Sequence, residues 1–447
     1  MITHDDITKM LEMEMQPALG CTGPTAYALA AARCKPFLTA DVNLMNIYVS
    51  PAFLKIGFGV ATPGTTEPGI GIAAAIGLLG GDYTLGMEVL KPCTPQNIQK
   101  AQLMVDEGRV QIFSDGEETG VYVRAEVITN NETVITILSG KHDGIISVSV
   151  NGQEMFHNED SLKEIEQDEV FLTPDIIFDY ISHVDTKELQ FLLDGYKMNL
   201  ALAEDGLKNE FGLHSGRAYL RSTFQKNKVP ADLFEQPLKY LPVTLDKKVQ
   251  ILVSAASDAR MGGSSYPAMA AMGDGNQGIT AILPVGLAAE SYNSSKEEMI
   301  RALALSCLML FFVKIHIGRS AAFCMCAIAA SAGATAGICY LKGLDEKAIR
   351  GAVKNSISPL AGMLCDGAKN GCALKMSIAS MTALNAVELA ESGIEVGYFD
   401  GVADNTLEET VNCITDIANK SMDLLDELMV NSILLKEERK RKKCKTI

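Results

Sequence analysis

The segment Gly362 to Lys375, GMLCDGAKNGCALK, contains the residues around which the rest of the chain is organised. Cys365 and Cys372 flank an Asp-Gly and an Asn-Gly pair, and these pairs favour tight turns with positive φ. The segment is therefore predicted to be a loop that precedes a helix over 374–390. Such a loop can direct two thiolates toward one point. Lys369, Lys375 and exposed backbone amides would lower the pKa of these thiols and stabilise anionic sulfur.

The composition of the 447 residues narrows the class of protein. The length allows two or three domains, or one large domain with an insertion. Hydrophobic residues make up 47% and aromatic residues 6%, and small side chains crowd the second half, which is typical of closely packed helices. The net charge of −16 argues against a nucleic-acid partner. The one basic segment, Lys436 to Lys445, is predicted to be the solvated end of the last helix.

Two segments bear on localisation. The N-terminus, MITHDDITKMLEMEM, is predicted to be a helix capped by Asp5 or Asp6 and not a signal peptide, so we expect a cytoplasmic protein. Ser320 to Leu341 is a run of 22 residues without a charge, long enough to span a membrane. Because it consists mostly of Ala, Gly, Ser and Cys, we expect a helix buried inside the protein and no membrane partner.

The periodicity of apolar residues predicts an α+β fold. Helices are predicted over 5–16, from Cys21 to about residue 35, over 68–79 and 95–107, with a strand and turn within 43–62; strands over 110–114, 121–129, 133–139 and 145–150; and helices from 161 onward. We therefore expect a largely helical catalytic domain made of 1–80 and 161–447. An antiparallel-strand α+β module over 81–160 would be inserted in it.

Three residues before residue 160 are candidates for chemistry. Cys21 lies at a predicted helix N-terminus, where the helix dipole favours a thiolate, although a small buried cysteine fits the spacing equally well. Lys55 is the one charge in an apolar run and needs a partner, which would be a carboxylate if the lysine is buried. His142 lies in the last turn of the module, where it is either a functional or a solvent-exposed histidine.

Two Gly-rich loops, 260–266 and 273–278, precede predicted helices and suit an anionic ligand. No Gly-Lys-Ser/Thr follows, and no strand-helix-strand unit surrounds them, so neither is a P-loop or a dinucleotide fingerprint. We expect a carboxylate at Gly275, Asn276 and Gln277, with a purely structural loop as the alternative.

Eleven cysteines in a cytoplasmic chain are not expected to form a disulfide framework. The pair Cys324 and Cys326 precedes a small-residue helix, and together with Cys365 and Cys372 it offers three thiolate positions. The CxxC pairs or nearby histidines of a zinc site are missing. Three thiolates at loop and helix ends instead fit an Fe-S cluster in which one iron has no protein thiolate. An open iron is a Lewis acid that can take a leaving group. Buried core cysteines are the alternative interpretation.

Four segments carry a resemblance that covers nearly the whole chain in the same order: GCTGP at 20–24, GDGNQGI at 273–279, IGRSAAFCMCAIAA at 317–330 and CDGAKNGCALK at 365–375. They resemble the signature segments of the L-cysteine desulfidase family, which is related to the alpha chain of iron-sulfur L-serine dehydratases. The resemblance implies a 4Fe-4S cluster and β-elimination without pyridoxal phosphate. Cysteine would be converted to pyruvate, ammonia and sulfide.

The resemblance also implies roles for individual residues. The cluster ligands would be Cys365, Cys372 and one of Cys324 or Cys326, of which Cys324 is favoured by its distance to Cys365 along the chain. Cys21 would be a catalytic thiol or a fourth ligand. The Asn276 loop would hold the substrate carboxylate, assisted by Lys55. His142 joins the catalytic set and Lys369 the substrate-binding set, and the Ala- and Gly-rich faces suggest a homodimer.

The chain departs from the family pattern at three places on the presumed substrate side. Gly23 replaces a glutamate, Ile56 replaces an asparagine, and Asp143-Gly144 follows His142 where the family has Thr-Asn. The loss of the glutamate removes an acid/base or ammonium-binding carboxylate. An L-serine dehydratase-type deaminase, or a non-catalytic relative that binds an amino acid or a cluster, is therefore the alternative.

Overall fold

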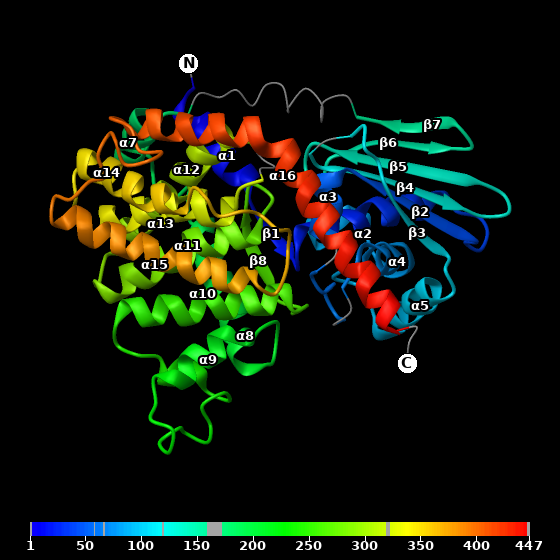
Figure 1. Ribbon diagram of the computed structural model, residues 1–447, viewed down its shortest axis with the longest axis horizontal. Helices are drawn as coiled ribbons and strands as arrows, with labels where there is room; N and C mark the ends of the chain where they lie inside the picture. Colours follow the sequence, from blue (N-terminus) through cyan, green and yellow to red (C-terminus); the bar gives the residue numbers. More distant parts are fainter. Residues whose placement is uncertain are drawn as a thin grey trace. The chain divides into compact units, whose positions relative to one another are not determined.

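The computed structural model describes residues 2–57, 59–65, 68–118, 120–158, 172–318 and 322–444 (Figure 1). The chain divides into two compact units, each with its own core. Unit 1 comprises Met1–Ala18, Glu169–Cys365 and Asn370–Asn419, and unit 2 comprises Leu19–Asp168, Asp366–Lys369 and Lys420–Ile447. The fold is α+β and mostly helical, as predicted.

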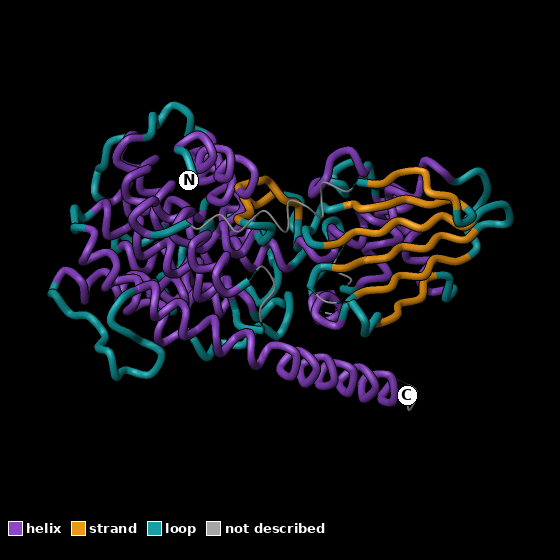
Figure 2. The backbone as a smooth tube through the Cα atoms, turned by 90° about the horizontal axis from the view of Figure 1, so that it is seen from above, coloured by secondary structure: helices purple, strands orange, loops and turns teal. Residues whose placement is uncertain are grey.

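Unit 2 is built on a six-stranded sheet of order β3-β2-β4-β5-β6-β7, which Figure 2 shows as neighbouring orange strands. The strands are β2 (Leu44–Val49), β3 (Val110–Ser114), β4 (Tyr122–Ile128), β5 (Thr133–Ser139), β6 (Ile145–Val150) and β7 (Gln153–His157). Strands β2 and β3 are parallel, and the other neighbours are antiparallel. Every second residue of β4 and β5 is buried, so one face of the sheet is packed in the core.

The N-terminal part contributes four helices, of which the first and third contact the sheet and the other two pack on these helices. They are α2 (Thr22–Cys34), α3 (Pro51–Gly57), α4 (Ile70–Gly80) and α5 (Pro95–Asp106). Helix α2 packs on β4 and β5 as well as on α4, and its alanines lie in the same hydrophobic core as the strands. Small residues allow this close approach, since a Cβ on Gly77 would lie 2.2 Å from the carbonyl oxygen of Ala28.

The structure corrects the predicted domain division. Residues 19–80 were assigned to the helical domain, but β2 pairs within the sheet and α2 packs on it, so they belong to the unit that contains the α+β module. Unit 2 also takes Asp366–Lys369 and the chain from Lys420 onward. The predicted boundary at 160/161 lies outside the described residues. The sequence pattern missed α3, which follows β2 directly, and β7.

Unit 1 is a set of packed helices. They are α1 (His4–Glu14), α7 (Pro174–His183), α8 (Phe191–Lys208), α9 (Ser215–Ser222), α10 (Leu245–Met261), α11 (Gly275–Ser291), α12 (Lys296–Ile317), α13 (Met325–Leu341), α14 (Glu346–Ile357), α15 (Cys372–Glu391) and the first part of α16 (Leu407–Cys444). Strands β1 (Met15–Leu19) and β8 (Pro267–Ala271) form a two-stranded sheet. Helix α13 packs on α11, α12, α14 and α15 and is buried over almost its whole length.

Two predictions about helices can be compared with the structure. Helix α1 is capped by Thr3 and not by Asp5 or Asp6, because Thr3 and Asp6 form a reciprocal capping box. The predicted buried helix over Ser320–Leu341 is α13, whose described part begins at Met325; residues 319–321 lie outside the described residues. In the described part of the chain, α12 is the helix long and apolar enough to cross a membrane, and 83% of its most hydrophobic window is buried inside the protein. A core helix has the same length and composition.

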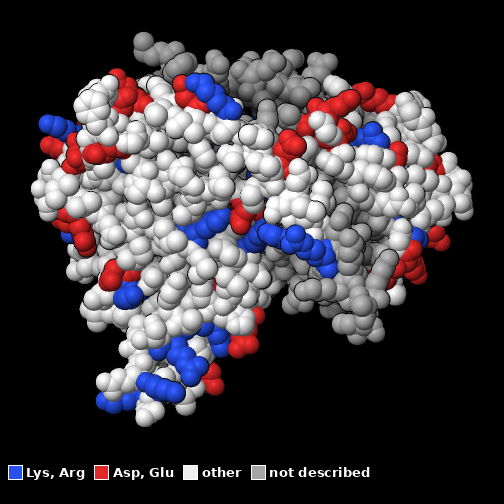
Figure 3. Space-filling model, viewed as in Figure 1, with Lys and Arg blue, Asp and Glu red and all other residues white. Residues whose placement is uncertain are grey.

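The surface carries charges of both signs. Acidic and basic side chains are interspersed over the face shown in Figure 3, although the chain as a whole is acidic.

Candidate active site

Unit 1 brings Cys324 and Cys365 onto neighbouring segments. The amide of Cys324 donates to the carbonyl oxygen of Met363 at 2.7 Å, and the amide of Cys365 donates to that of Ala322 at 2.7 Å. These bonds form an antiparallel bridge at the residues just before the two cysteines. Cysteines 41 positions apart in the sequence are therefore fixed beside each other by backbone hydrogen bonds.

Cys372 is connected to the same place through Lys375. Cys372 is the first residue of α15, and one turn later Lys375 donates from Nζ to the carbonyl oxygen of Leu364 at 2.7 Å. The charge of Lys375 also reaches Cys324, whose pKa it helps to lower. We call the group formed by Cys324, Cys326, Cys365, Cys372 and Lys375 the thiol corner. The three predicted cluster ligands all belong to it.

The two cysteines of the Cys-Met-Cys pair are in different states. The pKa of Cys324 is lowered, chiefly by its hydrogen bond with Cys326 and further by Lys375, and this outweighs burial. The pKa of Cys326 is raised well above its ordinary value by the same hydrogen bond, by burial and by the charge of Asp274. Cys326 donates from Sγ to Oδ2 of Asp274 at 3.1 Å. Cys324 is therefore the more acidic thiol of the pair, and Cys326 is the one that keeps its proton more strongly.

Asp274 is held as a carboxylate by buried cations. Burial opposes its ionisation, but the charges of Arg260 and Lys314 lower its pKa. Nη1 of Arg260 lies 3.5 Å from Oδ1 of Asp274, and Lys314 donates from Nζ to the carbonyl oxygen of Met272 at 2.8 Å. A Cβ on Gly275 would lie 2.4 Å from Nε of Arg260, so only glycine allows the guanidinium to lie against the start of α11.

The loop at Gly275 to Gln277, where we expected a carboxylate ligand, is capped by a carboxylate of the protein itself. Asp274 is the N-cap of α11 and accepts from the amide of Asn276 at 2.8 Å, so this amide is already used. The side chain of Asn276 points into the core, where it contacts Ser257 and Met261. Oε1 of Gln277 is buried and has no hydrogen-bond partner within the described residues. A substrate contact by Gln277 stays a prediction.

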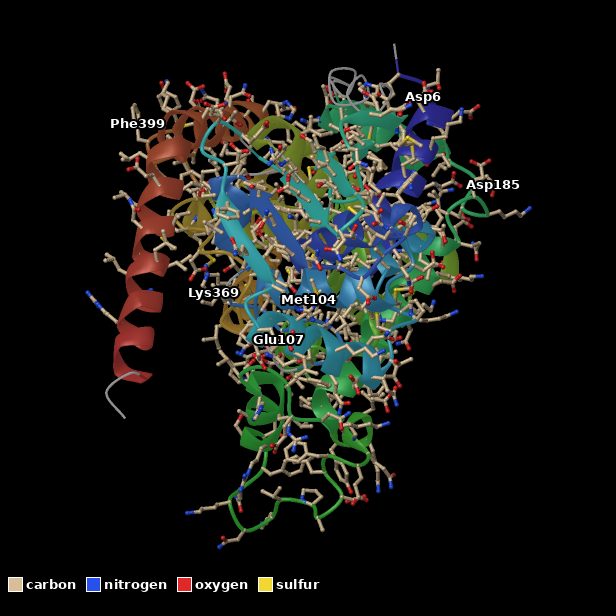
Figure 4. All side chains as sticks on the ribbon, turned by 90° about the vertical axis from the view of Figure 1, so that its right-hand side faces the viewer. Asp6, Met104, Glu107, Asp185, Lys369 and Phe399 are labelled. Atoms are coloured by element: carbon tan, nitrogen blue, oxygen red, sulfur yellow. The ribbon has the colours of Figure 1, made fainter. Side chains whose placement is uncertain are left out.

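Unit 2 places other predicted residues around α3. We call Cys21, Gly23, Lys55, Ile56 and Lys369 the α3 face; Figure 4 labels Lys369. Lys369 forms a parallel bridge with Gly59, just after α3. Cys21 is the N-cap of α2, as predicted, and is buried.

Aromatic contacts connect this face with His142. The hydroxyl of Tyr27 donates to the carbonyl oxygen of Phe53 at 2.6 Å, and burial and the nearby Cys21 raise the pKa of Tyr27. The rings of Phe53 and His142 have centroids 5.5 Å apart. His142 therefore lies within ring contact of the helix that carries Lys55.

Lys55 has a partner that the sequence did not suggest. Its Nζ lies 2.6 Å from Oδ1 of Asp426 on α16, and the side chains are 3% and 11% exposed. A buried ammonium next to a buried carboxylate is neutralised within the protein itself. In this conformation Lys55 binds an internal carboxylate, and its predicted role for a substrate carboxylate requires that this pair opens.

Two of the positions that depart from the family pattern contact each other. A Cβ on Gly23 would lie 2.4 Å from Cγ2 of Ile56. The Ile56 side chain thus fills the space that a side chain at position 23 would need. The two changes are coupled by packing.

The cysteines of the thiol corner are the candidate metal ligands of unit 1. No group of three or more His, Cys, Asp or Glu among the described residues converges as the ligands of a single metal ion would. An Fe-S cluster makes a different demand, because each cysteine binds a different iron. Three cysteines come from two helix starts and one bridged segment, and one of them has a lowered pKa and a lysine charge nearby, so they fit an Fe-S cluster.

Known proteins are similar in sequence to this chain over most of its length. The family model described as serine dehydratase alpha chain matches residues 84–431. The chain belongs to the serine dehydratase alpha chain family. It is also similar to the UPF0597 proteins of Desulforapulum autotrophicum (35% identity, 96% of this chain and 97% of the relative), Clostridioides difficile (33%, 95% and 98%) and Desulfotalea psychrophila (34%, 97% and 99%). Membership of this family indicates a lyase-type enzyme of the iron-sulfur dehydratase kind.

The sequence missed several residues at these sites. Arg260 and Lys314 were not assigned a role because nothing local shows that both face Asp274. The N-cap role of Asp274 could have been predicted from the sequence, since an aspartate just before a helix start is a preferred N-cap. Asp426 is 371 positions from Lys55, and no sequence pattern could have connected them.

Proposed function

We propose that the protein is a pyridoxal-phosphate-free, iron-sulfur-dependent lyase that catalyses β-elimination from a small L-amino acid. The favoured substrate is L-cysteine, which with water would give pyruvate, ammonia and sulfide. The observation that carries the proposal is the thiol corner, where Cys324 has a lowered pKa beside Cys365 and the start of α15. Family membership supports the reaction class.

Cys324, Cys365 and Cys372 would hold the cluster. When bound with one iron open, a 4Fe-4S cluster supplies a Lewis acid for the sulfur or oxygen that leaves the substrate. Lys375 fixes the carbonyl group before Cys365 and adds a positive charge near Cys324, so it favours the ionised thiol.

Asp274 and Cys326 support this arrangement from the other side. Because Asp274 is ionised, it accepts the hydrogen bond of the Cys326 thiol and keeps the proton on that sulfur. Arg260 and Lys314 keep Asp274 charged inside the protein. These four residues orient Cys324 and leave Cys326 outside the ligand set.

A second candidate function follows from the contact between Gly23 and Ile56. This contact replaces a polar pair of the family pattern by apolar packing on the α3 face. Such a change favours either another leaving group, as in an L-serine deaminase, or a relative that binds an amino acid without turnover. The predicted residues Cys21, Lys55, His142 and Lys369 keep their proposed substrate-side roles in both cases.

The test is anaerobic reconstitution with iron and sulfide, followed by assays of sulfide, ammonia and pyruvate release from L-cysteine, L-serine and close analogues. Reconstituted wild-type protein is expected to bind iron, absorb in the visible charge-transfer region and release sulfide from L-cysteine. Protein with Cys339→Ser, a buried cysteine near the C-terminal end of α13, is the matched control and should behave as wild type. Protein that binds no iron would contradict the proposal.

The substrate is decided by the same experiment. Cluster-loaded protein that releases pyruvate from L-serine without sulfide from L-cysteine would be a deaminase. Loaded protein that turns over neither compound, but melts at a higher temperature with one of them, would be a binding relative. We further propose a cytoplasmic location, with no nucleic-acid or membrane partner.

A further inference from the structure

Helix α16, red in Figures 1 and 4, has two apolar faces in its C-terminal part. One face is used inside unit 2, because Asp426, Val430 and Ile433 are buried and Val430 belongs to the hydrophobic core of that unit. A helix on the surface of a soluble protein needs only this one buried face. The second apolar face is therefore not needed for packing within unit 2.

The second face carries exposed leucines. Leu424, Leu428 and Leu435 are 61%, 54% and 53% exposed, and the exposed Asn431 lies between them. The spacing of four, three and four residues puts these side chains in one stripe, in the a and d positions of a heptad repeat. The stripe lies opposite the buried face, since Asp426 and Ile433 occupy f positions of the same repeat. A stripe of this kind is the contact surface of a two-helix coiled coil.

The spacing also suggests the partner. The order four, three, four reads the same from either end, so a second copy of this helix in the antiparallel direction places Leu424 opposite Leu435 of its partner and Leu428 opposite Asn431. Such a contact is self-complementary about a two-fold axis, which is the usual symmetry of homodimers. A single polar residue in the seam restricts the register at some cost in stability.

Charge favours the antiparallel direction. The sequence from 416 to 427 carries more acidic than basic residues, whereas 436 to 445 carries seven Lys and Arg residues against two glutamates. Parallel helices would place two basic ends side by side. In the antiparallel register that pairs Leu424 with Leu435, residues 436–445 of one copy lie along 414–423 of the other, which carry Asp416 and Asp423 against Lys420.

We propose that α16 forms a homodimer through this leucine stripe, as an antiparallel pair with a second copy of the chain. The proposal does not depend on the reaction that the protein catalyses. It assigns an interface to the homodimer expected from the sequence, and this interface differs from the Ala- and Gly-rich helix faces first considered for it.

The first test measures the mass of the full-length protein by sedimentation equilibrium over a range of concentrations. Wild type is expected to be a dimer, and the variant Leu424→Asp/Leu428→Asp should dissociate at least about a hundredfold more readily, because a desolvated interface does not accept two carboxylates. The control is Leu103→Asp, which changes an exposed leucine on α5 and should remain dimeric. Far-ultraviolet circular dichroism spectra should be alike for all three proteins, because the substituted side chains are exposed and the fold is unchanged.

The second test determines the helix direction. The variants Leu424→Cys and Leu435→Cys are purified separately, mixed and oxidised, with wild type as the background for the native cysteines. An antiparallel pair gives the mixed disulfide, because residues 424 and 435 of one helix are about 16 Å apart along its axis and each faces the other residue of its partner. Disulfides formed only within each separate variant would contradict the antiparallel pair.

Two outcomes would overturn the whole proposal. One is a wild-type protein that is monomeric at all concentrations, and the other is a dimer that Leu424→Asp/Leu428→Asp leaves intact. A monomer that sediments with anionic vesicles, and loses this binding in the same variant, would assign the stripe to a lipid surface instead.

Discussion

The thiol corner of unit 1 and the α3 face of unit 2 both contain predicted site residues, but their environments are opposite. The corner is polar: Cys326 donates to Asp274, Lys375 donates to the carbonyl oxygen before Cys365, and the pKa of Cys324 is lowered. The α3 face is packed with apolar side chains, and its Lys55 is neutralised by Asp426 within the protein. The residues that would hold a cofactor can therefore change separately from those that would contact a substrate. The departures from the family pattern lie among the substrate-side residues of the α3 face.

The largest effect is expected at the corner. Cys324→Ser should lower the iron bound after reconstitution about tenfold or more, because it removes the more acidic thiol of the pair. Cys326→Ser should keep the iron content within about twofold, because the hydroxyl can still donate to Asp274. Iron is measured by colorimetric assay on folded protein. The opposite result, with iron lost only from the Cys326 variant, would exchange the roles of the two cysteines.

The next effect concerns the buried ion pair of the α3 face. Asp426→Asn should lower the free energy of unfolding by about 3–5 kcal/mol, because it leaves a buried ammonium without a counter-charge. The double variant Lys55→Met/Asp426→Leu should recover most of this loss, since apolar groups of similar volume replace both charges. Glu427→Gln, an exposed neighbour on α16, is the control and should change little. Urea unfolding measures all three. Equal losses in the single and double variants would mean that the pair is not the cause.

A smaller effect tests the contact between the two departing positions. Gly23→Ala should cost about 1–3 kcal/mol, because the new methyl group overlaps the branched side chain of Ile56. Adding Ile56→Ala should restore part of that loss, so the two changes are not additive. Gly116→Ala, where a Cβ meets open space, is the matched control in the same unit. Strict additivity in thermal melts would show that the two residues do not pack on each other in solution.

The smallest effect compares thiols of the two units. Burial raises the pKa of Cys34, in the core of unit 2, to about 12, whereas the pKa of Cys324 is lowered. A raised pKa means that the folded state keeps a proton that the unfolded state loses, so stability is full below pH 9 and falls as pH rises from 9 toward 12. At pH 10 the loss is about 1.4 kcal/mol for this buried thiol, and Cys34→Ala should remove this part of the alkaline slope. An unchanged slope in urea unfolding at pH 8 and pH 10 would contradict the raised pKa.

Much of the fold could be predicted because its signals are local. The alternation of β4 and β5, the small-residue helix α13 and the N-cap position of Cys21 all follow from a few neighbouring residues. The domain boundary failed because it depends on contacts across the chain. Strand β2 pairs with β3, more than 60 residues later, and no local pattern states which domain a single strand joins.

The candidate site likewise has one part that local sequence predicts and one part that depends on contacts across the chain. The cysteine loop could be read from two turn-forming pairs, and the structure places Cys365 beside Cys324 as expected. The electrostatic supports could not be predicted, since Arg260 and Lys314 come from different helices and meet only around Asp274. The amide of Asn276 is not available as expected, because the side chain of the N-cap residue Asp274, two positions earlier, accepts its hydrogen bond.

Asp274 also sets a limit on how this protein can vary. One carboxylate caps α11 through Oδ1, accepts the thiol of Cys326 through Oδ2 and faces the guanidinium of Arg260. Asparagine would offer an amide donor where an acceptor is required, and glutamate is too long to reach back to its own helix start. Saturation mutagenesis should therefore find position 274 intolerant of all nineteen alternatives.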